Sequence, residues 1–347
     1  MDMFILAQFL VASALLLVVS CFSVRWMVQR CQRQARFDQP NHRSMHTNPT
    51  PTGAGIVIAI VVLIAIFSSM ILGVYASWFP LLIIVGSLAM IGWYDDRNPM
   101  SVRIRLLGFL ILAVVLLVGI GSVNQISITH DLRIAFQFRW IAWLFTALCF
   151  LWLVNLYNFM DGMDGLAGMQ SIIAGVVFAY WFYQVDALHL SLICWALVAA
   201  ASGFLIWNWS PAKIFMGDVG SLSIGGLFAC LAVIGVDRYD IPLMAFMLAL
   251  GPFVFDATFT LFRRLFRGER IYEAHSSHLY QRLAKCGVKH SLIVAIYALL
   301  MIISAVLAET LRLQQFSPLI TGLMVLIGVV CLLSWVVIAE ANVKRNE

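Results

Sequence analysis

The chain has 347 residues, of which 62% are hydrophobic and only 11% are charged. A water-soluble domain of this composition would expose large apolar patches, so the composition excludes that class and indicates a protein that crosses a membrane several times. The formal net charge of +5 suits anionic lipids and phosphorylated substrates, and it does not point to nucleic acid as a partner.

Apolar segments long enough to cross a bilayer follow one another along the chain. About 20 such residues are needed to span roughly 30 Å of hydrocarbon. By this criterion we predict an all-α polytopic membrane bundle of about eleven transmembrane helices, forming a single domain over residues 1–347. The predicted ranges are 4–24, 55–73, 79–93, 104–123, 140–157, 165–184, 188–208, 221–236, 241–262, 291–308 and 318–338.

The basic residues fall almost entirely in alternate loops. With eleven helices, only four of the 22 Lys and Arg residues lie on the second side of the membrane, namely Arg133, Arg139, Arg238 and Arg312. Short cytoplasmic loops concentrate Lys and Arg. The first side is therefore predicted to be cytoplasmic, with the N-terminus outside and the C-terminus inside.

The first acidic pair, Asp95 and Asp96, follows an apolar run and precedes Arg97. Adjacent carboxylates repel each other, so one of them should have a raised pKa unless a cation is present. A hard metal ion and a poised general base both explain the pair, and oxygen ligands without thiolates favour Mg²⁺ over zinc. The alternative is that the two acids are solvated at the membrane surface, are neutralised by Arg97 and have no functional role.

A second polar cluster lies between two long apolar runs. Its members recur at every third position: Asn155, Asn158, Asp161 and Asp164. An Asp at the centre of a membrane helix costs roughly 2.5 to 3.5 kcal/mol, so these acids indicate a functional site. A straight helix would spread the four side chains over about 180°, whereas a break at Gly162 or Gly165 would let them converge. A plain polar turn is the alternative.

A glycine-rich segment, 215–221, precedes the eighth predicted helix. Gly217 and Gly220 let backbone N–H groups approach a phosphate, Ser221 can cap the helix, and Asp218 adds an oxygen ligand. No Walker signature is present, and a helix-capping turn explains the segment equally well.

The longest predicted inner loop, 263–290, is rich in arginine and contains His275 and His278 on one helical face, close to Arg282. Imidazole and guanidinium donors together suit a diphosphate. A zinc site and a basic, lipid-facing loop are the alternatives. Upstream, Asp256 lies inside the ninth predicted helix, where an ion pair with Arg263 and a catalytic role are both open.

The acids from these separate segments all fall at the predicted cytoplasmic ends of helices. Together with the segment Asp38–His46 and the run Pro51–Gly55, the motifs stand in one order on one membrane face. In this the chain resembles the polyprenyl-phosphate N-acetylhexosamine-1-phosphate transferases, of the glycosyltransferase 4 type, over nearly its whole length. Residues 274–283 are similar to the bacterial branch that initiates O-antigen synthesis.

The resemblance implies a reaction in which undecaprenyl phosphate attacks the β-phosphate of a UDP-N-acetylamino sugar, giving undecaprenyl-diphosphate-sugar and UMP. It implies Mg²⁺ as cofactor, with Mn²⁺ able to replace it, and a location in the bacterial inner membrane with a periplasmic N-terminus. The catalytic loops, 25–54, 94–103, 155–165, 208–221 and 263–290, would face the cytoplasm. Homodimers occur among relatives.

The resemblance also suggests roles for individual residues. The catalytic set is Asp95, Asp96, Asp161, Asp164 and Asp218, with Asp218 the main metal ligand, assisted by Asp95 and Asp96. The substrate-binding set is Asn155, Asn158, Phe215, Gly217, Arg43, His46, His275, His278 and Arg282.

Two departures from the family pattern bear on the donor. No Lys stands between Arg43 and Pro51, and the histidine motif holds two histidines where many relatives have three. Both favour a simple amino sugar, of the GlcNAc, GalNAc, QuiNAc or FucNAc type, over a muramoyl-pentapeptide. An ion-coupled transporter and a membrane enzyme with another activated phosphate donor are the rival functions.

Overall fold

The computed structural model describes residues 3–33, 49–71, 78–127, 133–270, 276–315 and 317–346. Its helices are α1 (Met3–Arg33), α2 (Gly55–Ile71), α3 (Phe79–Asp95), α4 (Val102–Gly119), α5 (Arg139–Met160), α6 (Leu166–Gln184), α7 (Leu188–Asn208), α8 (Asp218–Tyr239), α9 (Leu243–Ala249), α10 (Gly251–Phe266), α11 (Leu279–Lys285), α12 (His290–Arg312) and α13 (Pro318–Asn346). Arg43, His46 and His275, which the sequence assigned to substrate binding, lie outside the described residues.

The helices confirm a polytopic membrane architecture. Eight of those described are long and apolar enough to cross a membrane, and α9 with α10 could form a ninth crossing that is bent by 88°. The apolar helices α2 and α3 are shorter, at 17 residues each. Every predicted range falls on a helix, except that the range 241–262 is divided between α9 and α10. The eleven crossings and the sidedness of the termini stay predictions.

The all-α prediction was wrong at one place. Between α4 and α5, β1 (Gln125–Ser127) and β2 (Arg133–Ala135) form a two-stranded antiparallel sheet in which Ile126 faces Ile134. The segments are too short to stand out from a chain this apolar. The sheet is joined to the end of α8 by the ion pair of Arg133 with Asp240.

The central helix of the bundle is α8, every residue of whose apolar window is buried. Small residues allow its neighbours to approach closely, as is usual between membrane helices. A Cβ on Gly226 would lie 2.1 Å from Leu88 in α3, and a Cβ on Gly225 would lie 2.9 Å from Tyr157 in α5. This packing places the first residue of α8, Asp218, between the ends of α3 and α5.

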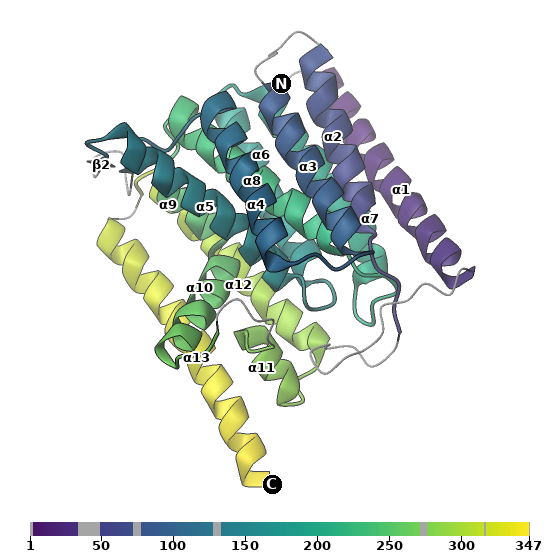
Figure 1. Ribbon diagram of the computed structural model, residues 1–347, viewed down its shortest axis with the longest axis vertical. Coiled ribbons are helices and arrows are strands. Elements are labelled where there is room, and N and C mark those ends of the chain that lie inside the picture. The colour runs from purple at the N-terminus through teal and green to yellow at the C-terminus, as the bar shows by residue number, and fades with distance from the viewer. Residues whose placement is uncertain are drawn as a thin grey trace.

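Figure 1 shows the arrangement of the other elements around α8. The helices α1 and α13 lie at the periphery, and the C-terminal part of α13 extends beyond the bundle. The loops before α2, between α3 and α4, and between α7 and α8 all lie at the end of the bundle that also carries α11. Polar segments that are remote in the sequence therefore meet at one end of the molecule.

Candidate active site

The segment before α2 and the segment before α8 run side by side. Phe215 N donates to Pro51 O at 2.8 Å, Ala54 N donates to Phe215 O at 3.1 Å, and Gly55 N donates to Met216 O at 2.9 Å. Two glycines make the contact possible, since a Cβ on Gly55 would lie 2.3 Å from the Cα of Gly220. The two glycine-containing motifs of the sequence thus form one backbone surface beside Asp218.

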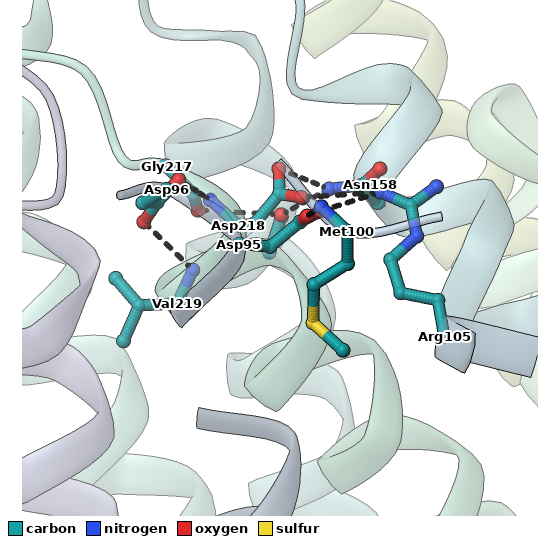
Figure 2. A network of polar contacts seen from close by, with 9 residues as sticks. Asp95, Asp96, Met100, Arg105, Asn158, Gly217, Asp218 and Val219 are labelled. Carbon is teal, nitrogen blue, oxygen red and sulfur yellow. Dashed lines mark hydrogen bonds and ion pairs between the residues drawn. The ribbon is translucent and has the colours of Figure 1, made fainter. Parts of the chain in front are cut away.

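Asp96 caps the N-terminus of α8. Its Oδ1 accepts from Asp218 N at 2.8 Å and its Oδ2 accepts from Val219 N at 3.3 Å (Figure 2). Gly217 has a φ of +77°, and a Cβ there would lie only 2.7 Å from Asp96 Oδ2, so this turn requires glycine. Burial raises the pKa of the Asp96 carboxyl, although the two backbone donors oppose that rise. Asp96 therefore fixes the position of Asp218.

Arg105 joins the carboxylates of Asp95 and Asp218. Its Nη1 lies 2.8 Å from Asp95 Oδ2 and 3.4 Å from Asp218 Oδ2 (Figure 2). Met100 N donates to the other oxygen of Asp95 at 2.5 Å. The Asp95 side chain is only 8% exposed, so its charge depends on these two partners.

Arg105 is not among the site residues predicted from the sequence, although a signal for it is present. The connection between α3 and α4 is short, and Ser101 caps α4, with Ile104 N donating to its side chain. The first turn of α4 must therefore lie beside the last turn of α3. A basic residue in that turn is a natural partner for Asp95.

The end of α5 supplies the third group of polar side chains. Asn158 Nδ2 donates to Asp218 Oδ1 at 2.7 Å and to Ser221 Oγ at 3.0 Å. Asp161 follows as the cap of α5. Burial raises its pKa well above the ordinary range, and the charges of Asp218 and Asp96 raise it further. The structure thus brings Asp95, Asp96, Asn158, Asp161 and Asp218 together.

Two other members of the 155–165 cluster face elsewhere. Asn155 Nδ2 donates to Leu151 O at 2.7 Å within α5. Asp164 Oδ2 accepts from Ala212 N at 3.1 Å and so braces the loop between α7 and α8. The predicted helix break is present, since α5 ends at Met160 and Gly165, with a φ of +79°, begins α6. The catalytic role of Asp164 and the binding role of Asn155 stay predictions.

The loop after α10 reaches the end of α5 through α11. Tyr280 OH donates to Phe159 O at 3.1 Å, and a Cβ on Gly162 would lie 2.2 Å from the same hydroxyl oxygen. His278, the N-cap of α11, is buried, with its ring centroid 6.3 Å from that of Phe159. This loop therefore lies beside the Asn158–Asp161 turn.

Two contacts of this loop differ from the sequence-based expectations. Arg282 forms a bidentate ion pair with Glu340 of α13, at 2.5 and 2.6 Å. Asp256 contacts His278 Nδ1 at 3.3 Å, and the ion pair with Arg263, one of the two roles left open for Asp256, does not form among the described residues. The i+7 spacing places Arg263 almost two helical turns away, a rise of about 10 Å, so a residue on a separate helix comes closer.

Comparison with known proteins agrees with this geometry. The family model described as glycosyl transferase family 4 matches residues 78–236, a range that includes Asp95, Asp96, Asn158, Asp161 and Asp218. A probable undecaprenyl-phosphate N-acetylglucosaminyl 1-phosphate transferase of Bacillus subtilis (strain 168) is 30% identical over 79% of this chain and 77% of its own length. The chain belongs to glycosyl transferase family 4.

Other members of the family have a different name. A phospho-N-acetylmuramoyl-pentapeptide-transferase of Frankia casuarinae is 30% identical over 65% of this chain and 75% of its own length. A protein of that name from Pelagibacter ubique is 27% identical over 89% of this chain and 92% of its own length. The relatives are phosphosugar transferases, so this chain is a membrane-bound transferase.

The side chains of the site offer carboxylate oxygens, which are the type of ligand that a hard divalent cation prefers. Within the described residues no three Asp, Glu, His or Cys side chains form a ready metal site. Asp95, Asp96 and Asp218 already have partners in Arg105, the N-terminus of α8 and Asn158, whereas Asp161 has no hydrogen-bond donor in the described part of the chain and faces other carboxylates. Mg²⁺ usually takes only one or two carboxylates together with substrate phosphates, so the carboxylates near Asp161 and Asp218 are donors of the right kind for that ion.

Proposed function

We propose that this transferase moves an N-acetylamino-sugar 1-phosphate from a UDP-sugar to undecaprenyl phosphate, giving undecaprenyl-diphosphate-sugar and UMP. The product would start a cell-surface polysaccharide such as O-antigen. The observation that carries the proposal is the group of four carboxylates, Asn158 and Arg105 at one end of the bundle in a chain of this family. The name of the Bacillus subtilis relative supports the same substrates.

In this reaction an oxygen of the lipid phosphate forms a bond to the β-phosphorus of the UDP-sugar. The bond from that phosphorus to the oxygen of the α-phosphate breaks, and UMP leaves with the electron pair. Transfer of this kind depends on positioning and on neutralisation of charge more than on covalent chemistry. The protein must therefore hold two anions together.

Individual side chains have distinct tasks in that scheme. Asp96 and Asn158 hold Asp218 through the hydrogen bonds at 2.8 and 2.7 Å. Arg105 offsets the negative charge of Asp95 and Asp218. Asp218 and Asp161 would hold Mg²⁺ or Mn²⁺, with Asp95 and Asp96 nearby, and a bound ion would neutralise the diphosphate of the donor.

The backbone beside Asp218 completes the proposed donor site. The paired segments before α2 and α8 bring Gly53 close to Gly217, and the space beside Gly53 is open, since a Cβ there would meet nothing within 4 Å. A phosphate of the donor would lie there. Phe215 is half-buried on the same segment, where its ring could contact the uracil base. Nucleotide sugars are made in the cytoplasm, so this end of an inner-membrane protein would face inward.

Two donors compete within the family. A simple UDP-amino sugar is favoured by the missing Lys before Pro51, by the two histidines and by the name of the Bacillus subtilis relative. A UDP-muramoyl-pentapeptide is favoured by the names of the relatives from Frankia and Pelagibacter. The two proposals differ in the donor and not in the chemistry.

Release of UMP by the purified protein tests the proposal. Undecaprenyl phosphate is supplied with UDP-GlcNAc, UDP-GalNAc or UDP-muramoyl-pentapeptide, and we expect UMP from an amino-sugar donor alone. EDTA should stop the release, and Mg²⁺ or Mn²⁺ should restore it. Release of UMP from UDP-muramoyl-pentapeptide would show that this molecule is a donor and would contradict the preference for a simple amino sugar. No release from any donor would refute the proposed reaction.

A further inference from the structure

A buried carboxylate outside the group around Asp218 links three helices. Asp256 of α10 is fully buried, and five groups contact its two oxygens. The donors are Leu279 N at 2.9 Å, Tyr280 N at 3.3 Å, His278 Nδ1 at 3.3 Å, Tyr297 OH at 2.6 Å and Thr260 Oγ1 at 3.2 Å. An isolated buried charge is very unfavourable, so this network is a specific arrangement built around one anion.

The short helix α11 depends on this carboxylate. A helix of seven residues is unstable alone, because nucleation costs more than so few hydrogen bonds return. Its first N–H groups have no partner inside the helix, and Asp256 accepts two of them, from Leu279 and Tyr280. A negative charge at a helix N-terminus is favourable as well. Asp256 therefore determines where α11 begins.

The carboxylate also fixes the histidine ring. A carboxylate only accepts hydrogen bonds, so Nδ1 of His278 carries the hydrogen that points at Asp256 Oδ1. The ring lies between two aromatic neighbours, with centroids 5.8 Å from Tyr280 and 6.3 Å from Phe159. Both its hydrogen bond and its packing hold it in one orientation.

From α11 the arrangement continues to the candidate active site. Tyr280 donates to Phe159 O, and Phe159 follows Asn158, whose side chain binds Asp218. Gly162 lies against the Tyr280 hydroxyl, next to Asp161. A shift of α11 would therefore move the turn that carries Asn158 and Asp161.

We propose that Asp256 is a positioning residue for the transfer reaction, which holds α11 and the ring of His278 against the end of α5 so that His278 meets the diphosphate of the donor. The proposal rests on the function proposed above, in which a UDP-sugar is the donor. Asp256 touches neither substrate. It acts through His278 and Tyr280.

The test compares Asp256→Asn with His278→Ala in the full-length protein. The amide keeps the shape of the side chain but removes the charge, so we expect the KM for the UDP-sugar to rise about tenfold in each variant. The KM for undecaprenyl phosphate should stay within about twofold, because that substrate does not rely on His278. In the double variant the two rises in KM should multiply only in part, since the changes share the interaction of Asp256 with His278.

Tyr297→Phe is the matched control. It removes the hydrogen bond that α12 donates to the same carboxylate, and it leaves the donors of α11 in place. We expect a lower Tm and an unchanged donor KM. If Asp256→Asn and Tyr297→Phe lower the Tm alike and neither changes the donor KM, Asp256 is only a structural brace and the proposal is wrong. Effects of Asp256→Asn and His278→Ala that multiply fully in the double variant would also overturn it.

A second variant covers the case in which Asp256→Asn does not fold. Tyr280→Phe leaves the buried carboxylate intact and removes the hydroxyl that donates to Phe159 O and also contacts Gly162 and Gln281. It should raise the donor KM several-fold, by the loss of one hydrogen bond that holds α11 on α5. A wild-type donor KM in Tyr280→Phe would overturn the proposed route from α11 to the site.

Binding of UDP in the presence of Mg²⁺, measured by calorimetry, separates this proposal from the proposed function. If the wild-type protein binds UDP without releasing UMP from any donor, the proposed reaction fails. Weaker UDP binding by Asp256→Asn would then still support the positioning role. If the wild-type protein does not bind UDP, the positioning role toward a diphosphate fails as well.

Discussion

The two ends of α8 carry acidic residues in opposite settings. At its last turns, Asp240 is paired with Arg133 through two hydrogen bonds, at 2.8 and 2.7 Å, and Asp237 accepts from Asn124 at 3.2 Å. At its first residue, Asp218 lies among three further carboxylates, and Arg105 is the guanidinium that contacts them in the described part of the chain. Charge is matched at one end and left in excess at the other.

This difference separates structural acids from functional ones. A pair such as Arg133 and Asp240 is complete by itself and needs no further partner. A group of carboxylates held in place by backbone N–H groups and by one Asn concentrates negative charge, which raises the pKa of Asp161 and which a bound cation would neutralise. The excess of carboxylates over basic side chains around Asp218 therefore distinguishes the site from the ion pair at the other end of α8.

The largest effect is expected from Asp218→Asn. The amide keeps the size of the side chain but loses the charge that would hold the cation, so turnover should fall by about a thousandfold or more. UMP release measures the loss, and an unchanged Tm shows that the fold is intact. Near-normal turnover would remove Asp218 from the proposed metal site.

Arg105→Gln should have the next largest effect. The change removes the positive charge that faces Asp95 and Asp218, and charge-assisted bonds of this kind justify a loss of about ten- to a hundredfold in turnover. Arg105→Lys keeps the charge and should recover part of the activity. Equal losses in the two variants would show that the shape of the guanidinium matters and not its charge.

Much of this arrangement could be predicted from the sequence. The apolar runs located the helices, and the alternation of basic loops predicted that Asp95, Asp161 and Asp218 lie at one membrane face. The convergence at Asp218 followed from that placement, because loops on one side of a bundle have little room to stay apart. The break after α5 followed from the glycines.

Other parts depend on packing that one sequence does not encode locally. Asp256 has its main partners 22 to 41 residues away, on α11 and α12, and their approach depends on the 88° bend between α9 and α10. The spacing rule that suggested Arg263 considers only one helix. Asp161 and Asp164 are only three residues apart, yet Asp164 binds a loop and Asp161 faces the site, because the chain changes direction between them.

A smaller effect is expected from Asp164→Ala, which tests whether the whole 155–165 cluster is catalytic. The variant loses the bond to Ala212 N, and a hydrogen bond of this kind contributes about 1 kcal/mol. The Tm should fall, and turnover should drop only a few-fold as the loop before α8 loosens. Measurements of Tm and of UMP release on the same variant distinguish a structural role of Asp164 from a catalytic one. A loss as large as that of Asp218→Asn would mean that Asp164 contacts a substrate or the cation.

The smallest effect is expected at the opposite end of α8, from Asp240→Asn. The pair with Arg133 is partly exposed, with side-chain exposures of 50% for Asp240 and 32% for Arg133, and exposed ion pairs contribute only about 0 to 1 kcal/mol. Turnover should stay within about twofold of the wild type at saturating donor, because no carboxylate of the site is changed. A large loss of UMP release with an unchanged Tm would show that the two ends of α8 are coupled. The charge excess around Asp218 would then not be enough to define the site.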